Sequence, residues 1–519
     1  MNTYTDFSHL LDSNDVPSSF EEERVLMEIG EMEREVEAMR MKMAEVEGRL
    51  RRHRAIVSQI RRIPPEILGQ IFHGTLPGVM GCSERRQLWD LALVCRKWRD
   101  SAYLMHSLWS SYVLDSPAIS YEQVTTFLRR SGTLPKSLEL CGGSCLCSNT
   151  DEVECYLARP TVIQLLTEGP SLHHLYLDMA KYDCFRTLID SLQSHNPSFM
   201  PRPWQSIQSI GLSFSDEYHP HLWRVPPTVP SAFTYIPSIT SLELQLPSFL
   251  CAFDAYRDSE SAVIGLPATV LSRLVSFTVQ CDWKGSHILG MLENCSNLEE
   301  LTVDFYGDPM SLDNPEDPVI QRLKNGLRIS LPRLRTLTLQ DAVTIELLDH
   351  IQAPALVKLN LEFNVERVAV FSAGAMRTFL ASSMCSLRSL SIHDCDLKAR
   401  DLTLTLSRIP SLAHLTMDNV VVVPADFWGA LIPENGSTAG PLRSLQNLTL
   451  LRLPYNYPLS GGLYDFLAKR FLWGSRQCKL TISFINTEPL VPPPLIANFN
   501  ACGVLMNILG TSILVADSC

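Results

Sequence analysis

A six-residue pattern recurs ten times along the chain and constrains its fold more than any other feature. An apolar residue is followed by two variable residues, a second apolar residue, one variable residue and a third apolar residue. The copies begin 22 to 36 residues apart, at Leu172, Ile207, Ile239, Leu274, Leu298, Leu334, Leu356, Leu387, Leu412 and Leu448. This recurrence is typical of repeat proteins, in which each unit buries its apolar face only against its neighbours.

Each copy predicts one short strand whose first, fourth and sixth side chains enter the core while the others face solvent. Segments between the copies, such as "SHILGMLENC" and "AGAMRTFLASSMC", have the spacing of helices. Prolines two residues before a copy can end the preceding segment without removing a ladder hydrogen bond; they are Pro170, Pro237, Pro332, Pro354 and Pro410. Near the C-terminus, "LTISF" and "GVLMNIL" predict the last strands. We therefore expect an α/β repeat architecture.

The repeated pattern resembles the leucine-rich-repeat family from about Leu134 to Ile508. That family places Asn or Cys three residues beyond each strand, and only Asn364, Cys395 and Asn456 comply here. The resemblance implies a degenerate, irregular leucine-rich-repeat-like solenoid, which we assign to residues 134–519.

A heptad pattern precedes the repeats. Its apolar positions alternate in steps of four and three, with His53 at one of them: Val25, Ile29, Met32, Val36, Met39, Met43, Val46, Leu50, Val57 and Ile60. This period predicts a coiled-coil helix over residues 20–62, started by a capping box at Ser18 or Ser19, after a disordered tail at 1–19. Ten glutamates lie between Glu21 and Glu47, whereas Gly48 to Arg62 carries six arginines and no acid. That charge division favours antiparallel self-association through residues 20–62.

Composition bounds the environment and the partners. A net charge of −12 argues against a general nucleic-acid binder, because phosphate contacts need a clustered basic surface. The N-terminus lacks a basic region followed by an apolar run, so no secretory signal is expected. Fifteen cysteines, an odd number, then indicate reduced thiols in the cytoplasm or nucleus. The uncharged run at 495–516 contains Asn and Gly residues that suit hydrocarbon poorly, so no membrane association is expected.

Motifs of catalysis and cofactor binding are missing from the sequence. It contains no phosphate-binding loop, no HExxH, no GxSxG and no GxGxxG after a strand. Four thiols at Cys141, Cys145, Cys147 and Cys155 could wrap a zinc ion, but the CxxC pairs of structural zinc sites are absent. We interpret them as loop thiols without metal, and expect no cofactor and no enzymatic activity.

The segment from Ile63 to Trp109 carries the functional signal. It opens with "IPPEILGQIF", where the prolines can start a helix, continues with "LVCRKWR" and ends with "SLW". About fifty residues in short helices cannot bury this much apolar surface alone. The three motifs resemble the F-box family in their order, although the interval from Pro64 to Trp98 is longer than usual. Together with the preceding heptads and the repeats, they resemble the F-box-like class of mushroom-forming fungi.

The resemblance implies a small all-α F-box-like domain at 63–112, followed by a helical connector at 113–133. It also implies docking onto a Skp-type subunit of a cullin–RING ubiquitin ligase. The residues that match the family's motif, and so are implied to bind that subunit, are Ile63, Pro64, Ile67, Leu68, Val94, Cys95, Trp98 and Trp109. We expect Pro64, Ile67 and Leu68 to face the Skp-type subunit, whereas Trp98 could instead lock the helices together.

Three functions stay open. The protein could be a substrate-recognition adaptor of an SCF-type (Skp–cullin–F-box) ubiquitin ligase, with an unknown protein substrate on the repeats. It could be a scaffold or interaction module outside any ligase, or an enzyme with an unrecognised site. For a substrate, we single out solvent-facing positions of mixed charge on the repeats: His173, His174, Arg335, Lys358, Arg388 and His414.

Overall fold

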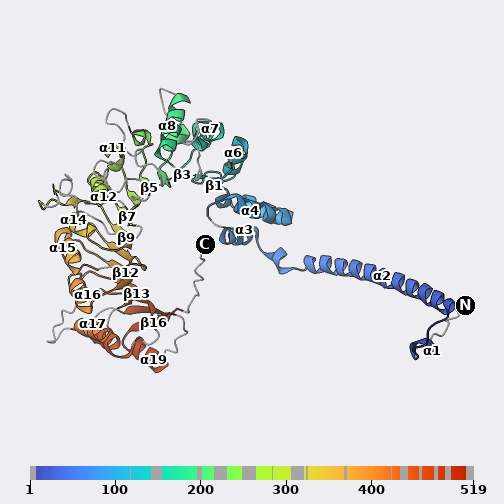
Figure 1. Ribbon diagram of the computed structural model, residues 1–519. Coiled ribbons are helices and arrows are strands. Elements are labelled where there is room, and N and C mark those ends of the chain that lie inside the picture. The colour runs from blue at the N-terminus through green and yellow to red at the C-terminus, as the bar shows by residue number, and fades with distance from the viewer. Residues whose placement is uncertain are drawn as a thin grey trace. The chain divides into compact units, whose positions relative to one another are not determined.

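The structure is a computed structural model, and the contacts within it divide the chain into two compact units (Figure 1). The described residues are 8–76, 78–116, 118–141, 155–179, 181–195, 202–215, 231–247, 265–282, 285–305, 321–322, 325–367, 371–421, 424–432, 442–454, 457, 459–472, 477–485 and 493–509. The helical unit comprises Met1–Thr75 and Asp90–Leu104. The sheet unit comprises Leu76–Trp89 and Met105–Cys519.

The helical unit contains one long helix and several short ones. Its elements are α1 (Ser8–Leu11), α2 (Ser19–Ile56), the 3₁₀ turn η1 (Gln59–Arg62), α3 (Pro65–Thr75), the end of α4 (Cys82–Val94) and α5 (Arg96–Leu104). Ser18 caps α2: its hydroxyl accepts from the Glu21 amide, and the Glu21 carboxylate accepts from the Ser18 amide at 2.8 Å. The capping box therefore sits at the first of the two serines that the sequence offered.

Helices α3 and α5 pack on each other within the helical unit. The rings of Phe72 and Trp98 lie 5.2 Å apart, and Leu68 and Phe72 are each 1% exposed. The Lys97 ammonium donates to the Arg61 carbonyl at 2.9 Å, which ties the start of α5 to the turn before α3. Trp98 therefore packs α5 against α3 and leaves part of its ring exposed.

In the described part of the sheet unit, fourteen parallel strands are paired in sequence order. They are β1 (Ser111–Leu114), β2 (Ser137–Cys141), β3 (His174–Met179), β4 (Ser209–Phe214), β5 (Ser241–Gln245), β6 (Ser276–Gln280), β7 (Glu300–Asp304), β9 (Thr336–Ala342), β11 (Lys358–Phe363), β12 (Ser389–Asp396), β13 (His414–Val421), β14 (Asn447–Leu453), β15 (Cys478–Phe484) and β16 (Val504–Ile508). Strands β8 (Ile329–Ser330) and β10 (Ile351–Gln352) form a separate parallel pair.

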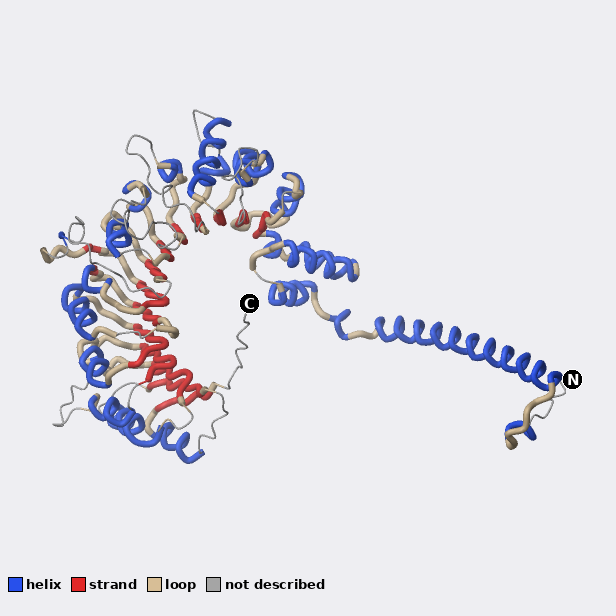
Figure 2. Tube along the Cα trace, in the orientation of Figure 1, coloured by secondary structure: helices blue, strands red, loops and turns tan. Residues whose placement is uncertain are grey.

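Helices and short turns connect successive strands and lie along one side of the sheet (Figure 2). Those described are η2 (His106–Trp109), α6 (Tyr121–Arg129), η3 (Tyr156–Ala158), α7 (Pro160–Glu168), α8 (Tyr182–His195), α9 (Arg202–Gln205), η5 (Ala232–Tyr235), α11 (Ala268–Leu271), α12 (Gly285–Leu292), α14 (Leu347–His350), α15 (Ala373–Ser383), α16 (Ala399–Leu406), α17 (Pro424–Ala430), the π-helical turn η6 (Leu459–Leu463), α18 (Tyr464–Leu472) and α19 (Pro493–Ala501). We call the opposite side the open face. The expected alternation of strand and helix is present.

The repeated pattern predicted the core of the sheet unit. In nine of the ten copies the first, fourth and sixth residues are buried, as at Leu356, Leu359 and Leu361, each 0% exposed. The strands of "LTISF" and "GVLMNIL" are also present, as β15 and β16. A parallel sheet covered by helices on one side needs this apolar inner face, because each strand buries its leucines only beside the next repeat.

The tenth copy of the pattern begins three residues earlier in the structure than the sequence predicts. Strand β14 pairs Leu448 with Leu415 and Leu450 with Met417, so the repeat is "LQNLTL" and begins at Leu445. Leu445, Leu448 and Leu450 are all 0% exposed. The misreading arose because leucines fill both registers of this segment, and only pairing with β13 selects one.

The sheet also begins earlier than the expected repeat domain. Strand β1 starts at Ser111, and residues 113–133, expected to be a helical connector, contain the rest of β1 followed by α6. β1 pairs with β2 from Ser111↔Ser137 to Leu114↔Leu140. The end of the F-box-like segment thus supplies the first strand of the sheet.

Candidate functional site

Helix α3 has one buried and one exposed apolar side. Leu68 and Phe72, four residues apart, are each 1% exposed, whereas Ile67 and Ile71, also four apart, are 46% and 44% exposed. Residues at this spacing share one side of a helix. Because the inner side is already filled, the outer isoleucines are free of the unit's own core.

Three further aliphatic side chains are exposed at the ends of α4 and α5. Leu93 and Val94 end α4 and are 75% and 59% exposed, and Leu104 ends α5 and is 70% exposed. Exposed apolar side chains on the short helices of one small unit are candidates for a protein-interaction surface. We call Ile67, Ile71, Leu93, Val94 and Leu104 the exposed apolar set.

Two of the residues expected to bind a Skp-type subunit are buried in the structure. Leu68 points into the packing of the helical unit and is 1% exposed, and Trp109 is 0% exposed in the sheet unit. The burial of Leu68 follows from the helical period, because Leu68 lies on the same side of α3 as the buried Phe72. Ile63 and Trp98 are half-buried; Pro64, Ile67, Val94 and Cys95 are exposed.

Trp109 belongs to an aromatic cluster inside the sheet unit. Its ring lies 4.9 Å from Phe127 and 5.9 Å from Trp89, and the Arg130 guanidinium lies 4.7 Å from Trp109 and 5.2 Å from Trp89. Tyr112 continues the cluster at 5.1 Å from Phe127. These contacts join the first half of α4 to β1 and α6 through aromatic and cation–π packing.

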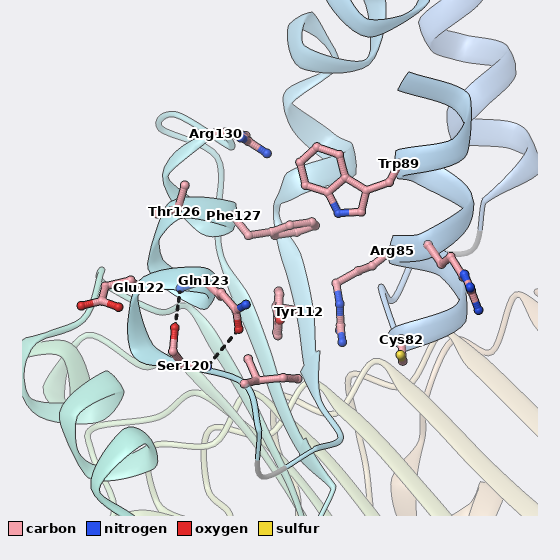
Figure 3. A pocket seen from close by; sticks show the side chains of 12 residues that line it. Cys82, Arg85, Trp89, Tyr112, Ser120, Glu122, Gln123, Thr126, Phe127 and Arg130 are labelled. Carbon is pink, nitrogen blue, oxygen red and sulfur yellow. Dashed lines mark hydrogen bonds between the residues drawn. The ribbon is translucent and has the colours of Figure 1, made fainter. Parts of the chain in front are cut away.

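A pocket of about 660 Å³ opens beside this cluster (Figure 3). Trp89 and Arg85 enter it from α4, Tyr112 from β1, and Phe127 from α6. Arg85 donates to the Val113 carbonyl at 2.6 Å and to the Met80 carbonyl at 2.9 Å, and pairs with Asp115 at 3.2 Å. Its charge is therefore used to hold the start of α4 against the end of β1.

The residues expected to bind a substrate do not converge on one site. His174, Lys358 and His414 occupy the same row across the open face, because each stands at the third position of its copy. His174 is six strands away from Lys358, about 30 Å at the usual strand spacing. Lys358 and His414 are two strands apart, with Ser389 between them.

Their individual contacts also differ. The His414 Nδ1 accepts from the Asn447 amide at 2.7 Å, and the His174 Nδ1 lies 3.0 Å from the Ser209 hydroxyl. Burial lowers the pKa of His174, although the nearby Glu243 and Glu139 carboxylates oppose this.

The other three expected substrate residues stand at the second position of their copies. His173 has a buried Nδ1 without a hydrogen-bond partner among the described residues, and Arg335 lies 3.8 Å from Glu299. Arg388 is exposed. His173 precedes β3, whereas Arg335 and Arg388 precede β9 and β12, so strand order separates His173 from the other two.

Sequence reasoning missed two polar groupings on the sheet unit. In the first, the Tyr176 ring crosses Gly211 on the next strand so closely that a Cβ there would stand 2.2 Å from its Cδ2. Burial raises the pKa of Tyr176, and Glu243 and Asp178 add to the rise, whereas a hydrogen bond with Ser213 lowers it. The glycine inside "IQSIGL" was the signal, since glycine within a strand marks a close approach.

The second missed grouping lies where β12, β13 and β14 end. Arg452 donates to Asp418 at 2.5 Å and to Asp394 at 2.9 Å, and His393 lies 3.3 Å from Asp418. Burial alone would raise the pKa of Asp418, but hydrogen bonds from His393 and Arg452 outweigh it and lower that pKa. We call His393, Asp394, Asp418 and Arg452 the strand-end cluster.

Left-handed backbone positions build this cluster. Asp394, Asn419 and Arg452 each have φ between 51° and 56°, two residues past the sixth motif position of adjacent strands, and Asp341 on β9 has φ of 50° at the same place. Asp and Asn tolerate this conformation, which marks the bulge ending these strands. The six-residue pattern contains no residue type that predicts this bulge.

The four thiols considered as zinc ligands lie only partly within the described residues. Cys145 and Cys147 lie outside the described residues; burial raises the pKa of Cys141 to about 12, and Cys155 is buried. Asn456, one of the three residues that comply with the leucine-rich-repeat pattern, is likewise outside them. Across the described ranges, no three His, Cys, Asp or Glu side chains gather as metal ligands do, and no helix has the length and apolarity to span a membrane.

Comparison with known proteins identifies one domain. Residues 60–115 match the family model "F-box-like", a range that takes in α3, α4, α5 and β1. The matched range does not include the repeats. The comparison gives no support for a leucine-rich-repeat family or for a family restricted to fungi. No curated protein matches the chain. The exposed apolar set therefore lies inside an F-box-like domain, a kind of domain associated with protein–protein interaction.

Proposed function

We propose that this protein is a substrate-recognition adaptor of an SCF-type ubiquitin ligase. Its F-box-like domain would bind a Skp-type subunit, through which a cullin is recruited, and its sheet unit would bind a protein substrate. One observation carries the proposal: the F-box-like match coincides with the exposed apolar set, which the rest of the described helical unit leaves uncovered.

The proposed chemistry needs no catalytic group on this chain. An adaptor accelerates ubiquitin transfer by holding a substrate lysine near a charged conjugating enzyme, so proximity and orientation supply the rate enhancement. We therefore propose that the protein is not itself an enzyme. The proposal also places it in the cytoplasm or nucleus, where ubiquitin ligases of this type act.

The sheet unit is proposed to act as a leucine-rich-repeat-like solenoid whose open face meets the substrate. Successive parallel strands present three rows of polar side chains there, and many neighbouring pairs in the middle row are Thr or Ser, as at Thr278↔Thr302 and Ser391↔Thr416. Neutral hydroxyls adapt to many hydrogen-bonding groups. Charged residues are dispersed along the sheet, which favours an extended protein segment over a single compact ligand.

The decisive experiment is co-purification of the full chain with a Skp-type subunit. The variant Ile67→Asp/Ile71→Asp puts two charges on the outer side of α3 and is expected to weaken binding at least about 100-fold. Leu68→Asp is a poor test, because a buried charge would unfold the unit. Leu404→Asp on α16 is the matched control, since Leu404 is 51% exposed and lies in the sheet unit.

Two outcomes separate the proposal from its alternative. If the parent chain recovers no Skp-type subunit, or the α3 variant binds it as well as Leu404→Asp does, the proposal is wrong. Recovery of the Skp-type subunit without cullin would instead favour a scaffold or interaction module outside any ligase. Equal thermal unfolding of both variants would show that loss of binding does not come from loss of folding.

A further inference from the structure

Helix α2 carries a continuous apolar stripe that nothing in the described chain covers. It is 38 residues long and none of its residues is buried. Ile29, Val36 and Leu50 are 40%, 48% and 47% exposed, although they stand at heptad positions. A helix gains most of its stability from packing an apolar side, so this stripe indicates a missing partner helix.

We infer that α2 pairs with α2 of a second copy of this chain, in an antiparallel coiled coil. The heptad steps assign Val25, Met32, Met39 and Val46 to position d. They assign Ile29, Val36, Met43 and Leu50 to position a. This inference is independent of the proposed function, because it uses no residue of the F-box-like domain.

One antiparallel alignment opposes these apolar residues in every layer. It is the alignment in which the numbers of facing residues add to 75, so that each a position meets a d position. The layers are Val25 with Leu50, Ile29 with Val46, Met32 with Met43, and Val36 with Met39, each formed twice by symmetry. Eight apolar layers would then cover most of the stripe.

The flanking charges select this alignment. Positions g and e on either side of the layers oppose Glu28 with Arg49, Glu35 with Lys42, and Glu33 with Arg40, again each twice. All six pairs are attractive. In the isolated chain Arg40 lies 3.7 Å from Glu37 on its own helix, a pair so exposed that it can rearrange at little cost.

Other arrangements oppose like charges. A parallel, in-register pair brings Glu28 against Glu33 and Arg49 against Arg54, which offsets its two attractive contacts. Moving the antiparallel alignment one heptad in one direction faces Glu33 with Glu47 and Arg40 with itself. Moving it in the other direction faces Glu35 with itself. The division of charge along α2 therefore specifies both orientation and register.

Dimerisation would give one assembly two F-box-like domains and two open faces. Two linked faces can engage one extended or repetitive substrate at once, which raises the effective concentration for the second contact. The pairing would thus act on avidity without adding contacts to either face.

The first test measures the mass of the full 58.3 kDa chain by light scattering over a micromolar concentration range. The parent is expected to have twice the mass of one chain. Glu28→Lys/Glu33→Lys/Glu35→Lys and Arg40→Glu/Lys42→Glu/Arg49→Glu each make all six pairs repulsive and should raise the dissociation constant by about 100-fold or more. Mixing these two variants restores every attraction and should restore the dimer.

The second test fixes the orientation, using the absence of cysteine from α2. Val25→Cys and Leu50→Cys should form a disulfide between chains when the two variants are mixed and oxidised, and neither should do so alone beyond the parent's background. Efficient linkage of Val25→Cys to itself would show a parallel pair and overturn the inference. A parent that stays monomeric, or reversed-charge variants that do not pair when mixed, would overturn it as well.

Discussion

Helix α2 and the sheet unit both carry a repeated apolar pattern. The apolar side chains of the pattern are buried in the sheet unit and exposed on α2. Leu361 on β11 is 0% exposed, whereas Leu50 on α2 is 47% exposed. In the sheet, every strand has a neighbouring copy of itself in the same chain, and the leucines are covered by it. The helix occurs once. Periodicity therefore shows which side of an element is apolar, and the number of copies decides whether the chain can cover that side itself.

The two tryptophans of the F-box-like segment repeat this contrast. Trp109 lies in the sheet unit and is 0% exposed among Phe127, Trp89 and Arg130. Trp98 lies in the helical unit, is half-buried and touches Phe72. Trp109 is enclosed by the sheet unit, whereas Trp98 keeps part of its ring exposed beside the aliphatic residues of the exposed apolar set.

The largest expected effect is that of Trp109→Ala. Removing a fully buried tryptophan should destabilise the sheet unit by about 3–5 kcal/mol, because it leaves a cavity and strips the cation–π contact from Arg130. Trp98→Ala should cost clearly less, since its ring is only partly buried. Thermal unfolding of the two variants against the parent measures both. A greater loss for Trp98→Ala would reverse the roles assigned to the two residues.

A smaller effect separates the two leucines. We expect Leu361→Ala to lower the free energy of unfolding by about 2–5 kcal/mol, the usual cost of a core leucine. Leu50→Ala should change the unfolding of the monomer by no more than about 0.5 kcal/mol, because its side chain is exposed there. Chemical denaturation at concentrations below dimer formation tests the pair. Similar losses at both positions would show that α2 is covered within the chain.

The smallest expected effect is the dependence of folding stability on acidic pH. Because the pKa of Asp418 is lowered from its ordinary value of 3.8, the strand-end cluster stabilises the folded state above that value. This contribution is lost as the pH falls through the lower, folded pKa. Asp418→Asn should therefore cost about 1 kcal/mol near neutral pH, and the difference from the parent should shrink below pH 3.8.

The matched control for the acid effect is Glu37→Gln on α2. Glu37 is 64% exposed beside Arg40, so its loss should change stability by less than about 0.5 kcal/mol at any pH. Denaturation midpoints between pH 2.5 and pH 7 compare the two. A difference for Asp418→Asn that stays constant with pH would contradict the lowered pKa.

Local sequence was sufficient for most strands of the sheet unit and for the start of α2. Leucines at the first, fourth and sixth positions reach the core because alternation within a strand fixes the side on which each residue lies. Ser18 and Glu21 begin α2 through contacts three residues apart. Where two registers were equally apolar, as around Leu448, the local pattern could not choose between them.

The local pattern could not predict which side chains are buried by packing between different helices and strands. Leu68 and Ile67 are neighbours of nearly equal hydrophobicity, and only the packing of α5 on α3 decided which one faces inward. Trp109 looked like part of a binding motif until β1 and α6 enclosed it. The strand-end cluster needs three strands in register before Arg452 can reach Asp394 and Asp418.

What the sequence determined by itself is the repeated strand, the heptad helix and the F-box-like segment, because each rests on contacts or periodicities within a few residues. What only the tertiary structure decided is which apolar side chains remain exposed. Exposure depends on residues distant in the chain, and the same leucine is core or contact surface according to what packs against it.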